Sequence, residues 1–175
     1  MLKLCYNFIS KKGENIMKPT EKYKQIILNA IKYGADANGK IDETKLANLV
    51  YLIDFTWYYE NLFSMSGVEY RKFSQGPVAD VYFRALDELE EHGVIIREVK
   101  KSTVFLSLIG SEAPNSSLSD DELIFIEKIS NTWSVKSTED IVSFAHEQLP
   151  WQICRDNEII PYGLITQEGL DLIYG

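Results

Sequence analysis

The stretch TKLANLVYLIDFTWYYENLF, from Thr44 to Phe63, decides the fold of this chain. From Leu46 onward, thirteen of its eighteen residues are apolar or aromatic, and neither Gly nor Pro interrupts it. At about 100° per residue, these side chains cover nearly the whole circumference of a helix. A helix of this kind lies either at the centre of a globular protein or in a membrane.

Three features disfavour a membrane span. Asp54 lies in the middle of the stretch, the tyrosines are scattered along it rather than gathered at its ends, and no cluster of Lys or Arg follows it. We therefore predict that this helix is the buried centre of a soluble domain that does not associate with membranes.

Length and composition indicate one globular domain. The chain has 175 residues, of which 45% are hydrophobic and 25% charged, enough to bury a core without disulfides or metal. Its two cysteines, Cys5 and Cys154, and its two histidines, His92 and His146, form no pattern typical of a disulfide or zinc site. The sequence predicts a cytoplasmic protein without a cofactor, and it makes no prediction of oligomeric state.

The first sixteen residues are set apart from the domain at 17–175. The codons for Lys12 to Met17 can contain a purine-rich ribosome-binding sequence ahead of a start codon. One interpretation is that Met17 is the biological start and residues 1–16 are a translated leader. The alternative is a start at Met1 and a mobile N-terminal tail.

Local patterns predict the remaining elements. A helix is expected over Glu21 to Tyr33, with Thr20 as its N-cap, followed by a turn in which Asp42 caps the central helix. The turn also resembles a calcium loop, but Gly34 and Lys45 stand where that loop requires acidic ligands. Calcium binding is therefore not predicted.

Further along the chain, Gly76-Pro77 is expected to open a helix that runs to about Glu91. The other expected elements are an extended piece at 68–73, a hairpin of Val94–Val99 with Thr103–Leu108, a linker-like loop at 110–117, helices capped at Ser119 and Ser137, a short turn or helix near Trp151, and a last helix capped by Thr166. The predicted fold is α+β and predominantly α: a helical bundle around the buried central helix, with one β-hairpin.

Asp54 is the first candidate for a functional or structural role. A buried carboxylate costs several kcal/mol unless cations or N–H groups satisfy it. We expect it to act as a structural tether, paired with Arg71 or Lys72 or with the backbone N–H groups of the turn from Ser74 to Gly76. The alternative is an acid in a functional site, but no histidine or second acid accompanies it at a suitable spacing.

The chain lacks the common signatures of catalysis. It has no nucleophile elbow, phosphate-binding glycine loop, zinc-protease motif or dinucleotide fingerprint. The chain is therefore expected not to be an enzyme.

The order of elements up to residue 109 is similar to a winged helix, with Pro77–Glu91 as recognition helix and Lys100-Lys101 at the tip of the wing. That helix, however, carries a net charge of −4 and the whole chain −8. Because binding to nucleic acid depends on cationic contacts with phosphate, DNA binding is disfavoured.

The chain has more large aromatic residues than a small core needs, and the surplus candidates are Tyr70, Tyr82, Trp133, Trp151 and Tyr162. Exposed aromatic side chains with an acidic rim are typical anchors of a protein-binding surface. The alternative is that all of them belong to the core.

Several short motifs occur along the chain in one order: Lys45-Leu46 and VYLIDF at 50–55, Gly67 with Tyr70, Gly76-Pro77-Val78 followed by Tyr82 and Leu86, Leu149-Pro150-Trp151, and Ile160-Pro161-Tyr162. Together, from about Thr20 to Ile165, they resemble the Panacea domain of SocA-like antitoxins, a family also described as phage-associated proteins. The sequence departs from the common Lys-Tyr-Gly-Pro form at Ser74-Gln75-Gly76-Pro77.

This resemblance implies a mainly helical antitoxin that neutralises a cognate protein toxin by direct contact. It also allows a proteolytic adaptor that delivers its toxin to a protease, while the element order keeps a winged-helix-like transcriptional regulator as a third hypothesis. Family toxins are chemically diverse, so the resemblance does not identify the toxin. The partner-binding candidates are Tyr70, Gly76, Pro77, Tyr82, Trp151 and Tyr162.

Overall fold

A computed structural model describes residues 18–110 and 117–175. The elements are α1 (Pro19–Gly34), β1 (Ile41–Asp42), α2 (Glu43–Asn61), β2 (Tyr70–Phe73), β3 (Gly76–Ala79), α3 (Tyr82–Glu91), β4 (Ile95–Lys100), β5 (Thr103–Leu108), α4 (Asp120–Ser134), α5 (Thr138–Glu147), α6 (Leu149–Ile153), the 3-10 helix η1 (Tyr162–Gln167) and α7 (Asp171–Tyr174). The predicted leader or tail, residues 1–16, lies outside the described residues, as do residues 111–116 of the predicted loop.

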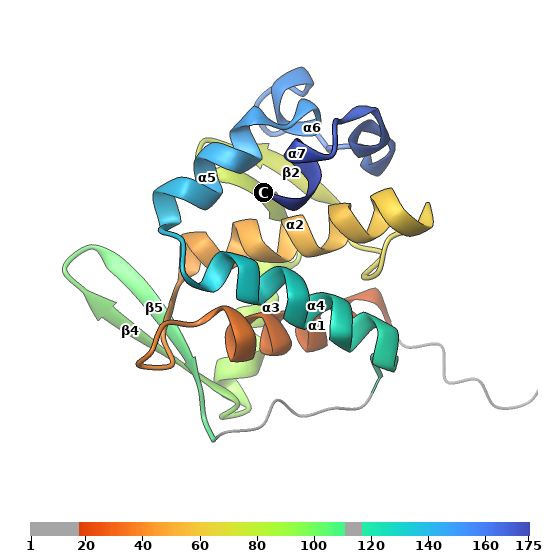
Figure 1. Ribbon diagram of the computed structural model, residues 1–175. Coiled ribbons are helices and arrows are strands. Elements are labelled where there is room, and N and C mark those ends of the chain that lie inside the picture. The colour runs from red at the N-terminus through yellow and green to blue at the C-terminus, as the bar shows by residue number, and fades with distance from the viewer. Residues whose placement is uncertain (1–17, 111–116) are drawn as a thin grey trace, which may run out of the picture.

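The central helix α2 is buried, as its composition predicts. It lies between α1 and α4 on one side and α5, α7 and η1 on the other (Figure 1). Every residue from Lys45 to Trp57 is buried. Asp42 caps the helix as predicted, because its side chain accepts hydrogen bonds from the N–H groups of Thr44 and Lys45. The fold therefore forms around α2, and the predominantly α, α+β class is confirmed.

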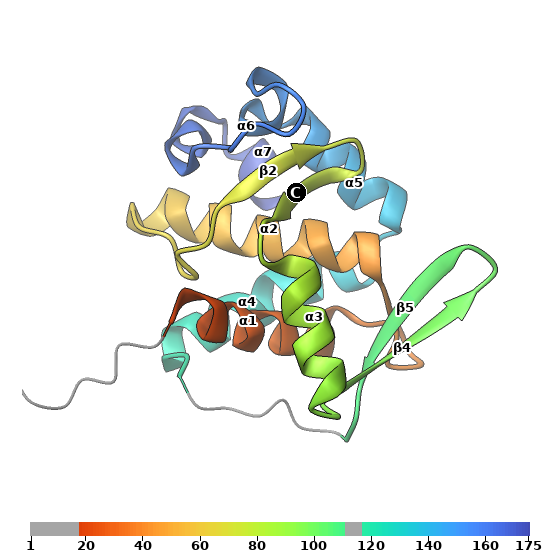
Figure 2. The ribbon, with the colours of Figure 1, turned by 180° about the vertical axis from the view of Figure 1, so that it is seen from behind.

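The strands form two small antiparallel sheets. Strand β5 lies between β1 and β4, and the hairpin of β4 and β5 is the predicted one. The order along the chain is α1, β1, α2, β2, β3, α3, β4, β5, which is that of a winged helix with the β2–β3 hairpin inserted between α2 and α3. Figure 2 shows α3 crossing in front of α1, with the β4–β5 hairpin extending to one side.

The second sheet corrects the predicted helix start at Pro77. Gly76–Ala79 is strand β3, which pairs with β2 around a turn at Ser74 and Gln75, and α3 begins only at Tyr82. Pro77 lies opposite Lys72, whose N–H and C=O bond instead to Glu158 and Asn157. The missing N–H of proline therefore removes no bond between the two strands.

The other helices begin at the predicted capping residues, with two exceptions. The capping boxes at Ser119 and Ser137 are confirmed. Helix α1, however, starts at Pro19 with Lys18 as N-cap, so Thr20 lies within its first turn. The hydroxyl of Thr166 donates to the Gly163 carbonyl inside η1 and does not cap α7.

Across the described ranges, no helix has both the length and the hydropathy that are needed to span a bilayer.

Candidate partner-binding site

Asp54 holds the turn that follows α2. Its carboxylate is fully buried and accepts hydrogen bonds from the N–H groups of Met65 (2.9 Å) and Ser66 (3.2 Å) and from the Ser66 hydroxyl. The Tyr162 hydroxyl donates a further bond of 2.9 Å. Asp54 is thus a tether, but of the turn at Met65 and Ser66 rather than of the turn at Ser74 to Gly76.

The ionisation of this group is governed by burial. Burial raises the pKa of Asp54, and the hydrogen bonds from Ser66, Tyr162 and Met65 oppose the rise. Burial and the neighbouring carboxylate also raise the pKa of the Tyr162 and Tyr70 hydroxyls. Both hydroxyls therefore remain protonated donors.

The predicted pairing of Asp54 with Arg71 or Lys72 is wrong. Arg71 donates to Asp80 (2.8 Å) and to the Asn157 carbonyl (3.0 Å). Side chains alternate along a strand, so Arg71 points away from the face on which Tyr70 lies against Asp54. Lys72 lies on the Tyr70 side, but its ammonium group donates to the Cys154 carbonyl (2.9 Å).

Gly76 lies at the hairpin turn against Asn48 of α2. The Asn48 amide donates to the Gln75 carbonyl (2.8 Å) and to the Thr44 carbonyl (2.9 Å). Gly76 has φ +112, and a Cβ at this position would overlap the Asn48 side chain. Glycine is therefore required here both for its backbone conformation and for the close approach.

Trp151 fixes the same hairpin from the other side. Its indole N–H donates to the Phe73 carbonyl (3.2 Å). The centre of its ring is 3.9 Å from the centre of the stacked His146 ring and 3.9 Å from the ammonium nitrogen of Lys72. Burial and the Lys72 charge lower the pKa of His146. Trp151 is half-buried, so much of its surface is already in contact with the protein.

The burial of the other candidates favours the core alternative for the leftover aromatics. Tyr70 is 0% and Tyr82 1% exposed, Trp133 is also buried, and the Tyr82 hydroxyl donates to the Glu43 carbonyl (2.8 Å). Gly76 and Pro77 are buried as well, and Tyr162 is half-buried. Tyr70, Gly76, Pro77 and Tyr82 lie where β2, β3 and α3 pack near α2, whereas Trp133 of α4 packs against Phe144 of α5.

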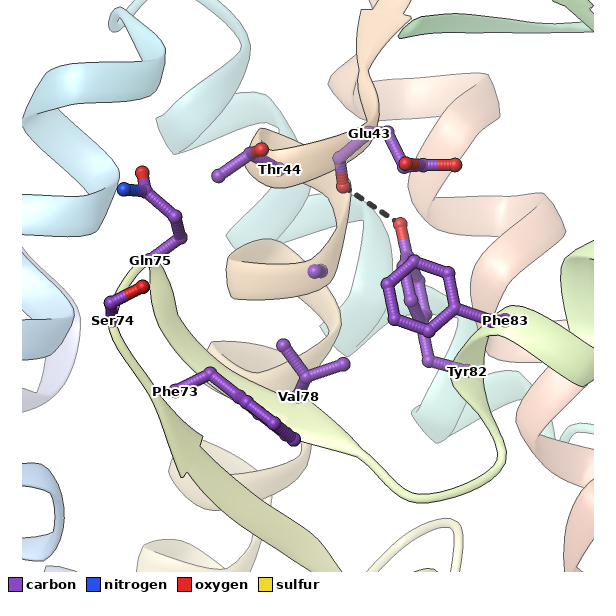
Figure 3. A pocket seen from close by; sticks show the side chains of 9 residues that line it. Glu43, Thr44, Phe73, Ser74, Gln75, Val78, Tyr82 and Phe83 are labelled. Carbon is purple, nitrogen blue, oxygen red and sulfur yellow. Dashed lines mark hydrogen bonds between the residues drawn. The ribbon is translucent and has the colours of Figure 1, made fainter. Parts of the chain in front are cut away.

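The β2–β3 hairpin, α3 and the start of α2 frame a cleft, and of the predicted partner-binding residues only Tyr82 lines it. The hairpin cleft, as we call it, encloses about 240 Å³ and is lined by Glu43, Thr44, Ala47, Phe73, Ser74, Gln75, Val78, Tyr82 and Phe83. In Figure 3, Glu43, Tyr82 and Phe83 lie at one side, Phe73, Ser74 and Gln75 at the other, and Val78 between them. Phe73 is 43% and Phe83 57% exposed.

The sequence interpretation did not single out Phe73 and Phe83, although a signal was present. In β2, alternation from buried Tyr70 places Phe73 on the outward side with Arg71. Phe83 follows buried Tyr82 and precedes Arg84, outside the apolar stripe of α3 formed by Tyr82, Ala85, Leu86 and Leu89. Both are large aromatic residues at positions where a polar residue is expected.

The family model described as "Antitoxin SocA-like, Panacea domain" matches residues 46–152, more than half of the chain. The chain belongs to this family. No curated protein and no solved structure gives a significant match to it.

The matched range of the Panacea domain contains most of the hairpin cleft. It begins on α2, includes β2, β3 and α3, and ends at Gln152, directly after Trp151. Two separated motifs, Gly76-Pro77-Val78 and Leu149-Pro150-Trp151, meet at the β2–β3 hairpin through the bond from Trp151 to Phe73. Two of the motifs by which this chain resembles the family therefore hold the hairpin in place.

Proposed function

We propose that this Panacea domain is a non-enzymatic cytoplasmic antitoxin that binds and masks a cognate protein toxin. The observation that carries the proposal is the family match, which covers most of α2 together with the β2–β3 hairpin and α3. The hairpin cleft supports it, because two exposed aromatic rings frame an apolar hollow of about 240 Å³. Aromatic residues at such positions commonly carry protein–protein binding energy.

Co-expression tests this function. Each reading frame beside the gene for this chain is expressed alone and together with the chain, and growth is followed. We expect one neighbour to arrest growth, the chain to relieve the arrest, and the two proteins to elute together in gel filtration. Absence of any neighbour whose toxicity the chain relieves would overturn the proposal.

The same experiment separates masking from the proteolytic adaptor. A masking antitoxin leaves the amount of toxin unchanged and inhibits it stoichiometrically. An adaptor lowers the amount of toxin, and the loss depends on a host protease. A pulse-chase measurement of the toxin with and without the chain distinguishes the two.

The winged-helix order of α1 to β5 favours one second candidate, a transcriptional regulator. Charge opposes it, because α3 has four acidic residues against Arg84 alone, and the Arg97 guanidinium at its side is held by Asp87 (2.5 Å) and Glu90 (2.7 Å). Operator binding that weakens steeply with salt would support the regulator. We propose that this scaffold serves protein contact instead.

A further inference from the structure

The walls of the hairpin cleft are fixed before any partner arrives. The hairpin turn is joined to α2 by the bond from Asn48 to Gln75, and α3 is joined to α2 by the bond from Tyr82 to Glu43. Phe73 and Phe83 are carried on these two walls, with Val78 between them (Figure 3). A preformed site of this kind loses little conformational entropy on binding.

One charged group stands at the edge of this apolar surface. Glu43 is half-buried beside Phe83, and among the described residues no hydrogen bond or ion pair reaches its carboxylate. The nearby Arg97 is already shared by Asp87 and Glu90. Burial raises the pKa of Glu43, with smaller contributions from Asp42 and Asp87, while Arg97 opposes the rise.

The place of Glu43 in the first turn of α2 explains why a carboxylate is tolerated there. It does not explain why the carboxylate is half-buried next to an exposed aromatic ring without a partner. A cation brought in by another protein would supply that partner, and it would also lie near the Phe83 ring, where cations bind favourably.

We infer that the hairpin cleft receives an apolar side chain of the toxin that is followed by an arginine or lysine, with Phe73 and Phe83 around the apolar group and Glu43 paired with the cation. This inference rests on the proposed function and names the chemistry of the segment that the antitoxin grips. The net charge of the chain, −8, agrees with it, because an acidic protein attracts a cationic segment.

Peptides test the chemistry without the toxin. The probes are acetyl-Gly-Phe-Arg-Gly-amide, its Phe-Glu counterpart and its Ala-Arg counterpart, titrated at millimolar concentration while the methyl signals of Ala47 and Val78 are followed by NMR. We expect the Phe-Arg peptide to shift both signals saturably and to bind about fivefold more tightly than the Phe-Glu peptide, the effect of one partly exposed ion pair. The Ala-Arg peptide should shift neither signal.

Variants test whether the peptides that shift the NMR signals bind in the hairpin cleft. Glu43→Gln should abolish the preference for Arg over Glu, and Phe83→Ser should abolish binding. Ile124→Ser is the matched control, because Ile124 is an exposed apolar residue of α4. Helix α4 lies on the opposite side of the molecule from α3 (Figures 1 and 2). Equal binding of the Phe-Arg and Phe-Glu peptides, or unchanged binding in a Phe83→Ser variant that melts like the wild type, would overturn the inference.

Growth rescue separates this inference from the proposed function. If the wild-type chain relieves toxin arrest and Phe83→Ser and Glu43→Gln relieve it equally well, the antitoxin function stands and the assignment of the cleft is wrong. If the wild-type chain relieves no arrest, the proposed function itself fails. Rescue by the wild type and by Ile124→Ser, but not by Phe83→Ser, supports both.

Discussion

The side chain of Asn48 packs so closely against the α-carbon of Gly76 that a Cβ at position 76 would overlap it. The same asparagine donates to the Gln75 carbonyl, so the contact and the hydrogen bond act together. Any residue other than glycine would also have to adopt φ +112. We predict that Gly76→Ala lowers the free energy of unfolding by about 3 kcal/mol, the combined cost of backbone strain and overpacking.

Urea denaturation measures this loss, and Gly39→Ala provides the control. Gly39 has φ +72 in the turn before α2, but its missing Cβ would meet nothing within 4 Å. Gly39→Ala should lower the free energy of unfolding only through backbone strain, by about 1 kcal/mol. Equal losses for the two variants would show that the contact with Asn48 contributes nothing.

Asp54 gives a second prediction about stability. Asp54→Ala leaves the N–H groups of Met65 and Ser66 buried without an acceptor, so the free energy of unfolding should fall by about 3 to 5 kcal/mol. Asp36→Ala is the matched control, because Asp36 also accepts two backbone N–H groups, those of Asn38 and Lys40, but in an exposed turn. A loss at position 54 no larger than that at position 36 would contradict the tether.

The pH dependence of this tether has a definite sign. Because burial raises the pKa of Asp54 in the folded state, the folded protein binds the Asp54 proton more tightly than the unfolded chain does. The additional stability that comes from this tighter proton binding is therefore fully present below the ordinary carboxyl pKa, about 3.9, and is lost as pH rises through the folded-state value, while the hydrogen bonds from Met65 and Ser66 remain.

Asp54→Asn removes this titration and leaves the other acids in place. We predict that the stability of the wild type relative to Asp54→Asn decreases as pH rises from about 4, the ordinary carboxyl range. Paired urea titrations at several pH values measure the difference. A difference that stays constant or grows with pH would show that the hydrogen bonds outweigh burial.

Some of these relationships could be predicted from the sequence because they are local. The apolar circumference of α2, the cap at Asp42 and the capping boxes at Ser119 and Ser137 each depend on residues within one or two helical turns. Burial of Asp54 followed from the same pattern. The identity of its donors did not, because Tyr162 reaches it from 108 residues away.

The β2–β3 hairpin shows where local reasoning fails. Gly-Pro is a common helix start, and only the pairing of Lys72 with the segment at Asn157 and Glu158 makes a strand at Pro77 acceptable. The hairpin cleft was missed for the same reason. Its walls come from α2, the hairpin and α3, so its existence depends on how three separate segments are packed.

Trp151 yields a prediction about the hairpin. Trp151→Phe keeps an aromatic ring between His146 and Lys72 but loses the bond to the Phe73 carbonyl, which should cost about 1 kcal/mol. Trp151→Ala loses the ring contacts as well and should cost about 3 kcal/mol. Thermal unfolding measures both, and equal effects would show that stacking does not stabilise the hairpin.

His146, stacked on Trp151, should give the opposite pH dependence from Asp54. Burial and Lys72 lower its folded-state pKa, so its contribution is present above the ordinary value of about 6.5 and is lost as pH falls through the folded-state value. We predict that His146→Gln makes stability less dependent on pH on the acid side of about 6.5. A pH profile of His146→Gln that is identical to that of the wild type would contradict this.

Lys45 joins the central helix to the end of α4. It is only 8% exposed, and its ammonium group donates to the carbonyls of Ser134 (3.2 Å) and Lys136 (2.6 Å). These carbonyls lie at and just beyond the C-terminus of α4, where helical carbonyls lack partners and a cation is favourable. Lys45 therefore serves as a C-terminal cap provided by another helix.

Lys45→Met keeps the aliphatic stem but removes the donors, so we predict that the free energy of unfolding falls by about 2 kcal/mol. Lys101→Met, at the exposed tip of the β4–β5 hairpin, should change it by less than about 0.5 kcal/mol. Hydrogen exchange adds a local readout: the last turn of α4 should lose protection in Lys45→Met, whereas β4 and β5 should not. Uniform loss of protection would mean that Lys45 supports the whole core and not the end of α4 in particular.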